Sequence, residues 1–141
     1  MMHTYKIVDI PVKMEKFYGK GKMLHPCVEE IESLIKMIPK GALTTIDALA
    51  RRMAKDSGAD VTCPMRTGNT IKKIAERYSN DNLDIEIPFW RVIRSNRMLI
   101  KTKNIAFYAS LIEDEGFKLC FTKNDTIKVE VDPSNMFFFN L

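Results

Sequence analysis

Two adjacent aromatic residues occupy the most distinctive short motif of the sequence. Phe89 and Trp90 lie within Ile87-Pro88-Phe89-Trp90-Arg91-Val92-Ile93, between a proline and an arginine. A phenyl ring offers no nucleophilic atom, and an indole N–H is a hydrogen-bond donor that cannot act as a base. The motif therefore excludes covalent catalysis at these two positions. Two interpretations remain open, an aromatic lining for a ligand pocket or a buried aromatic pair of the core.

Few other residues have the spacing expected of a catalytic, metal-binding or phosphate-binding site. Cys63 directly precedes Pro64, a good first residue for a helix, and Arg66 follows closely, a setting that can favour a reactive thiolate. The competing interpretation, which we favour, is a small capping or core residue. His25 and Cys27 form a lone His-x-Cys without a second pair at zinc spacing, and no glycine-rich phosphate loop is present. We therefore expect no catalytic residue, metal or cofactor.

Basic residues are concentrated in one part of the chain. The net charge is +4 over 141 residues, but residues 66–103 alone contain nine basic and four acidic residues, a net charge of +5. A basic segment on a nearly neutral body is typical of a protein that binds a polyanion, and nucleic acid is the first candidate. The alternative is an ordinary solvated lysine-rich face.

Composition sets further bounds. The chain is 45% hydrophobic and 28% charged, which suits one globular domain with appendages. No apolar run approaches the roughly 18 residues of a membrane span, and the first residues lack the apolar core of a signal peptide. Three dispersed cysteines argue against a disulfide framework and for a cytoplasmic protein.

Helical signals dominate the centre of the chain. Apolar spacing predicts a helix from about Pro26 to Ile38 and another that begins after a capping box, with Thr44 as the N-cap and Asp47 three residues on. A third helix is predicted to start at Pro64 and to run to about Tyr78, with an inner face that consists of Met65, Ile71, Ile74, Ala75 and Tyr78. Two short helices joined by a turn, after a supporting helix, outline a helix-turn-helix.

Strand signals follow these helices. Residues 91–94 and 97–101 predict a hairpin about the turn Ser95-Asn96, and a basic hairpin after a helix-turn-helix would be a wing. We therefore predict a mainly α fold with a small β wing: a winged helix-turn-helix core, a short N-terminal strand near residues 5–10 and a C-terminal β-hairpin. The expected organisation is an N-terminal extension (1–25), a DNA-binding domain (26–117) and a C-terminal extension (118–141). The apolar end, residues 136–141, is expected to dock on the core.

The predicted third helix and hairpin supply the candidate DNA contacts. Polar residues of the helix recur on one face, where Arg and Asn can contact base edges and Lys and Arg can hold phosphates. The basic residues of the hairpin would lie along a duplex backbone. The candidates are Arg66, Asn69, Thr70, Lys73 and Arg77 on the helix, and Arg91, Arg94, Arg97 and Lys101 on the hairpin.

Several motifs resemble the DNA-binding domain of O6-alkylguanine-DNA alkyltransferases. Pro88-Phe89-Trp90-Arg91-Val92 resembles their Pro-Cys-His-Arg-Val, in which the Cys accepts the alkyl group. The similarity extends to Ile38-Pro39-Lys40-Gly41, Thr44-Thr45, Gly68-Asn69 and Leu111–Gly116, over about two thirds of the chain. Thr62–Gly68, which reads Thr-Cys-Pro-Met-Arg-Thr-Gly, is similar to a branch of the family that lacks the nucleophile.

The resemblance implies a non-catalytic alkyltransferase-like protein. Such proteins bind alkylated duplex DNA, flip a base into a pocket and flag the lesion for excision by repair proteins. By the same resemblance Phe89, Trp90 and Glu115 would belong to the base pocket, Thr45 to the DNA contacts, and Lys72 or Lys73 would replace the family's intercalating arginine. An alternative function is a winged-helix transcription regulator or protein-interaction module without lesion recognition.

Overall fold

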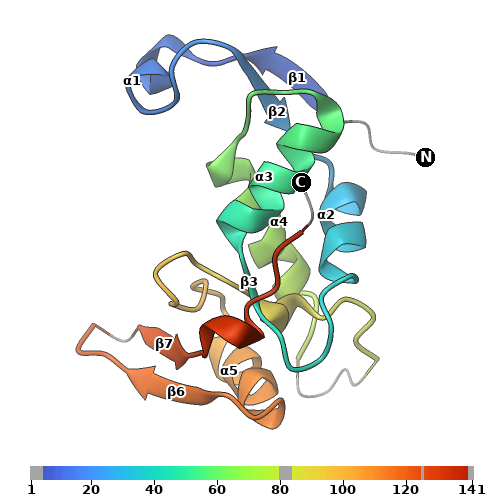
Figure 1. Cartoon of the computed structure of the whole chain (residues 1–141). Helices are drawn as coiled ribbons and strands as arrows, with labels where there is room; N and C mark the ends of the chain where they lie inside the picture. Colours follow the sequence, from blue (N-terminus) through green and yellow to red (C-terminus); the bar gives the residue numbers. More distant parts are fainter. Residues whose placement is uncertain (1–4, 80–83, 125, 140–141) are drawn as a thin grey trace.

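Helices and short strands alternate along the part of the chain that the structure, a computed structural model, describes: residues 5–79, 84–124 and 126–139. In these ranges the α-helices are α1 (Glu15–Tyr18), α2 (Val28–Ile35), α3 (Ile46–Ser57), α4 (Pro64–Ala75) and α5 (Ile105–Asp114). The strands are β1 (Lys6–Asp9), β2 (Lys22–His25), β3 (Thr44–Thr45), β4 (Val61–Thr62), β5 (Val92–Ile93), β6 (Lys118–Phe121) and β7 (Ile127–Glu130). Three short 3-10 turns are η1 (Val12–Met14), η2 (Phe89–Arg91) and η3 (Pro133–Asn135). The chain is thus a mixed assembly of helices and small sheets (Figure 1).

Local signals set the ends of the two central helices. Thr45 is the N-cap of α3, and its hydroxyl accepts a hydrogen bond from the Ala48 amide at 3.2 Å. The prediction of Thr44 as the cap is wrong by one residue, because the Thr44 hydroxyl instead donates to the Phe137 carbonyl at 2.7 Å. Pro64 is the first residue of α4, as predicted, but the α-helix ends at Ala75.

The core lies where α2, α3, α4 and α5 meet. Its fully enclosed side chains include Leu49, Ile71, Ile74 and Tyr108, each at most 1% exposed. Met65 was expected on this inner face, and that prediction is wrong, because the residue is 69% exposed. It lies one helical turn before exposed Asn69 and thus on the opposite side of α4 from Ile71.

The predicted hairpin at residues 91–101 is reduced to a tight turn, and its two sides pair with distant strands. The turn closes as expected, because the Arg97 amide donates to the Arg94 carbonyl at 2.9 Å and the Arg94 amide donates to the Met98 carbonyl at 2.8 Å. However, β5 pairs in parallel with β3, with Thr44 opposite Val92. The returning segment pairs with β7 through the bridge between Met98 and Lys128. The two sides of the turn therefore join different sheets, and the segment is not an independent hairpin.

The first and last described segments of the chain are both attached to the body. The N-terminal strand β1 pairs with β2, and β2 pairs in parallel with β4, which leads directly into α4. At the other end β6 and β7 form the predicted hairpin, and the Phe137 amide donates to the Leu43 carbonyl at 2.7 Å. Met136 and Phe139 are 9% and 6% exposed, so they dock on the core as expected, whereas Phe138 is 59% exposed and residues 140–141 lie outside the described residues. None of the helices in the described ranges has the length and apolarity that crossing a bilayer requires.

Replacement of Thr45 by alanine should destabilise the protein by about 1 kcal/mol, because α3 loses its side-chain cap and the Ala48 amide loses an acceptor. Urea unfolding followed by circular dichroism measures this. Ser33→Ala, which removes an exposed hydroxyl bonded to the Glu29 carbonyl, is the control and should change stability by less than about 0.5 kcal/mol. Equal effects of the two substitutions would contradict the capping role.

Candidate nucleic-acid interface

An aromatic cluster surrounds Phe89 in the predicted pocket motif. The 3-10 turn η2 contacts both α4 and α5, and it directs the Phe89 ring inward, 1% exposed. The ring stacks on Tyr78 with centroids 5.7 Å apart and makes edge-on contacts, each at 5.6 Å, with Trp90 and Tyr108. The Tyr108 hydroxyl donates to the Val92 carbonyl at 2.5 Å, and complete burial raises the pKa of this phenol. Phe89 is therefore a fixed apolar element, while Trp90 keeps partial exposure.

Glu115, at the C-terminal end of α5, ties this cluster to the rest of the molecule. Its carboxylate accepts hydrogen bonds from the Trp90 indole N–H at 2.5 Å and from the Gly41 amide at 2.9 Å. It also forms an ion pair with the Arg91 guanidinium at 3.0 Å. The Glu115 side chain is only 5% exposed, so its charge depends on these three donors. The residue implied by the resemblance is thus brought together with Trp90, as expected.

Arg91 lies inside the molecule. Its side chain is 15% exposed and, besides the pair with Glu115, its Nη1 donates to the Ile38 carbonyl at 2.8 Å. The guanidinium also sits over the Trp90 ring, 5.4 Å from the centroid. Arg91 was expected to contact a DNA backbone from a hairpin. The structure corrects its place: Arg91 lies in η2, before the turn, and its guanidinium binds Glu115 and Ile38 inside the molecule.

The predicted reading face of α4 is largely in contact with solvent. Arg66, Asn69, Lys72 and Lys73 are exposed, and Thr70 is partly buried. Arg77 lies beyond the end of α4. Its guanidinium forms an ion pair with Glu32 of α2 at 2.8 Å, which links α2 to the segment that follows α4.

The turn after β5 places further basic residues near the start of α3. Arg94 and Lys101 are exposed, Arg97 is partly buried with a positive φ of 71°, and the Ser95 hydroxyl donates to the Asp47 carboxylate at 2.5 Å. Thr45, by contrast, is 5% exposed with its hydroxyl occupied as the α3 cap.

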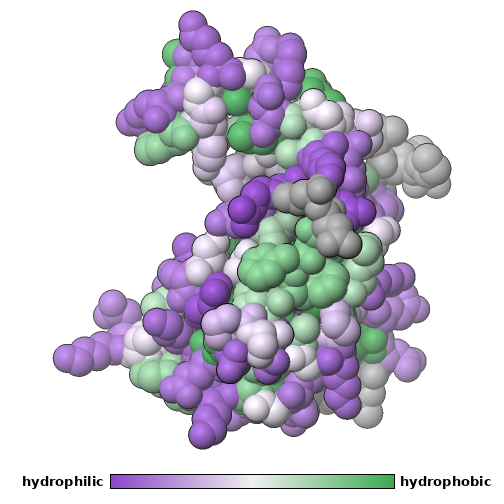
Figure 2. Space-filling model, viewed as in Figure 1, coloured by the Kyte–Doolittle hydropathy of each residue, from purple (hydrophilic) through white to green (hydrophobic). Residues whose placement is uncertain are grey.

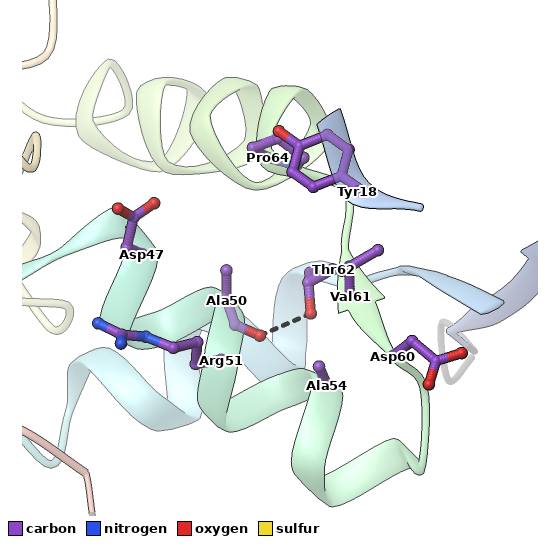
Figure 3. A pocket seen from close by; sticks show the side chains of 9 residues that line it. All are labelled: Tyr18, Asp47, Ala50, Arg51, Ala54, Asp60, Val61, Thr62 and Pro64. Atoms are coloured by element: carbon purple, nitrogen blue, oxygen red, sulfur yellow. Dashed lines mark hydrogen bonds between the residues drawn. The ribbon is translucent and has the colours of Figure 1, made fainter. Parts of the chain in front are cut away.

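A groove crosses the start of α4 on this side of the molecule. A hollow of about 350 Å³ lies between α3 and the segment before α4, with Tyr18, Arg51 and Pro64 in its lining (Figure 3). A neighbouring hollow of about 340 Å³ shares Asp47 and Pro64 with it and extends to the turn residues Arg94, Ser95 and Asn96. Tyr18 was not among the predicted site residues, although the basic, aromatic composition of residues 16–22 is the sequence signal for a loop that could contact phosphates.

Comparisons with known proteins identify the fold. No protein-family model matches the chain, and no curated protein sequence does. Among solved structures, the chain resembles S. pombe Atl1 in complex with damaged DNA containing O6-carboxymethylguanine, with a TM-score of 0.55 and 20% identity. It also resembles S. pombe ATL in complex with DNA, with a TM-score of 0.54 and 19% identity. Each match covers 78% of this chain and 93% of the other.

The chain shares its fold with Atl1. The resemblance to alkyltransferase-like proteins that the motifs indicated is therefore confirmed at the level of the fold. In the described residues, no group of three or more His, Cys, Asp or Glu side chains is placed to hold a metal ion.

Glu115→Gln should destabilise the protein by about 2–4 kcal/mol, because it leaves the Arg91 guanidinium largely buried without a counter-charge. Adding Arg91→Met should recover part of this loss, with a coupling energy above about 1 kcal/mol in a double-mutant cycle by urea unfolding. Asp56→Asn in the more exposed Arg52–Asp56 pair is the control and should cost less than about 0.5 kcal/mol. Additive effects of the Glu115 and Arg91 substitutions would show that the two charges are not coupled.

His25 reports the electrostatic environment of Arg66. Burial, then the positive charges of Arg66 and Lys6, lower the pKa of His25 below its ordinary value of 6.5. Because the folded state resists protonation, His25 costs stability as the pH falls from 6.5 toward this lowered pKa.

Arg66→Gln should therefore raise the pKa of His25 toward 6.5, as an NMR titration of its imidazole protons would show. Arg94→Gln should leave the titration of His25 unchanged. A pKa of His25 that does not respond to Arg66→Gln would mean that this charge does not act on the imidazole.

Proposed function

We propose that this protein is a non-catalytic alkyltransferase-like protein that binds duplex DNA and recognises an alkylated base flipped into a pocket beside Trp90. In this proposal α3 and α4 are the helix-turn-helix and the turn at Arg94–Arg97 acts as the wing. The observation that carries the proposal is the Trp90–Glu115–Arg91 network. It holds an aromatic pair rigidly in the frame Pro88 to Val92, where the related alkyltransferases have their reacting cysteine and histidine.

Rigid aromatic side chains suit recognition of a base. A flipped base gains stacking and apolar contacts that offset the few kcal/mol needed to unstack it, and a damaged base is easier to extrude than a normal one. Phe89 cannot move without disturbing Tyr78 and Tyr108, so the partly exposed Trp90 is the ring available to a base.

Charge and fold support DNA as the partner. The exposed side chains of α4 and the Arg94 turn flank one groove, and they can contact phosphates and base edges. Both solved structures that the chain resembles are complexes with DNA.

The buried position of Cys63 supports binding without covalent transfer. Its side chain is 7% exposed and packs with Ile10 and Met23 before α4, where an alkyl group on a base would not reach the sulfur.

The test is fluorescence anisotropy with two duplexes that differ only by O6-methylguanine in place of one guanine, at two salt concentrations. We expect salt-sensitive binding of both duplexes and about tenfold tighter binding of the modified one, corresponding to ~1.4 kcal/mol. Trp90→Leu should remove the preference and leave binding of the plain duplex nearly unchanged.

Intact-protein mass measured after incubation with the modified duplex should be unchanged. A methyl adduct would overturn the non-catalytic proposal. Equal affinity for the two duplexes would remove lesion recognition, and absence of binding to both would overturn the DNA-binding function.

A further inference from the structure

The first 21 described residues form a projecting basic element that has no role in the DNA contacts proposed above. Residues 5–25, here called the N-terminal arm, comprise β1, η1, α1 and β2, and the tip with α1 extends away from the helical body (Figure 1). The arm contains five lysines and two acidic residues, a net charge of +3. Its tip also carries exposed aromatic side chains, Phe17 and Tyr18.

The base of the arm is fixed. The Ile10 amide donates to the Gly21 carbonyl at 2.9 Å, and Ile10 and Met23, 5% and 1% exposed, pack with Cys63 in a small separate core. The Asp60 carboxylate accepts from the Lys22 amide at 2.8 Å. Because β4 pairs with β2 and is followed directly by α4, the arm has a set position relative to α4.

That position puts the arm beside the proposed DNA-binding groove. Tyr18 lines the same hollow as Pro64, the first residue of α4 (Figure 3). The root of the arm lies near α4 as well, because the Cys63 amide, directly before α4, donates to the Leu24 carbonyl of β2 at 2.9 Å. Figure 2 shows that the surface is hollowed between the largely hydrophilic projecting arm and the lower part of the molecule.

The tip presents side chains that match a nucleic-acid strand. Lys13, Lys16 and Lys20 are exposed, and Phe17 and Tyr18 are 71% and 41% exposed. Lys16 lies 5.0 Å from the centroid of the Phe17 ring. Burying such rings inside the protein would stabilise it, so their exposure indicates an external partner. Lysines interleaved with aromatic rings can contact phosphates while the rings pack on sugars or bases.

We propose that the N-terminal arm is a second DNA-contacting element, which holds the backbone of duplex DNA flanking the site bound by α4. This inference rests on the proposed function and extends the interface along the duplex. Lys13, Lys16 and Lys20 would contact phosphates, and Phe17 and Tyr18 would pack against the sugar edge of the same strand. The arm therefore contributes affinity and salt dependence, and it leaves lesion preference to the pocket at Trp90.

The experiment compares the full chain with Lys13→Gln/Lys16→Gln/Lys20→Gln on unmodified duplexes of about 10 and about 30 base pairs, one and three helical turns. Anisotropy titrations over a salt series give the slope of log Kd against log salt. On the long duplex the triple variant should lose about 2 to 3 units of slope, because each phosphate contact contributes about 0.9. On the short duplex, which offers fewer phosphates to the arm, the loss of slope should be smaller.

The matched control is Lys36→Gln/Lys40→Gln/Lys55→Gln, which removes the same charge from exposed positions outside the arm and the groove. It should leave the slope within about 0.5 on both duplexes, a tolerance smaller than one phosphate contact. Phe17→Ser tests the aromatic contribution and should weaken binding of the long duplex.

The outcomes separate the two proposals. If the unmodified chain binds neither duplex, the DNA-binding function fails and the arm proposal fails with it. If the chain binds both but the arm variant has an unchanged slope on the long duplex, the arm proposal is overturned and the proposed function stands. An equal loss of slope in the control variant would also overturn the arm proposal, because the loss would then result from the lower net charge alone.

Discussion

The charge of Glu115 is the constraint on which the candidate site depends. A carboxylate that is 5% exposed must be compensated, and its three donors come from Gly41 before β3 and from Trp90 and Arg91 in η2. One side chain at the end of α5 thereby fixes two distant segments. The Phe89 ring, packed under Trp90, takes its orientation from the same network. The hydrogen bonds and the ion pair of Glu115 therefore account for the rigidity of the site, and this rigidity does not require a catalytic group.

The surrounding fold joins three basic segments to one another. The start of α4 follows β4 and is therefore tied to the N-terminal arm, and the Arg94 turn is tied to α3 through Ser95 and Asp47. The C-terminal segment closes the other side of β3 through Phe137. These connections explain how a chain with many two-residue and four-residue strands holds separate basic segments in one geometry.

Sequence reasoning succeeded where the signals are local. Pro64 and the apolar stripe with Ile71 and Ile74 identified α4, and the alternation in residues 117–131 identified the C-terminal hairpin. It failed where pairing is non-local. The partners of β5 and Met98 lie about 48 and 30 residues away, at Thr44–Thr45 and Lys128, and no pattern within residues 91–101 encodes them. Likewise, Arg91 was expected at the surface, the usual place of arginine, and its burial is decided by Glu115, 24 residues later.

The central claim is that Trp90 contacts a flipped, alkylated base, and its fluorescence tests this directly. Trp90 is the only tryptophan of the sequence, so tryptophan emission reports the surroundings of this side chain alone. Saturation with a duplex that contains O6-methylguanine should quench and shift this emission, because a base would stack on the indole. The same duplex with guanine, at saturation verified by anisotropy, should leave the emission nearly unchanged. An unchanged emission with the saturated O6-methylguanine duplex, or an identical change with both duplexes, would contradict the claim.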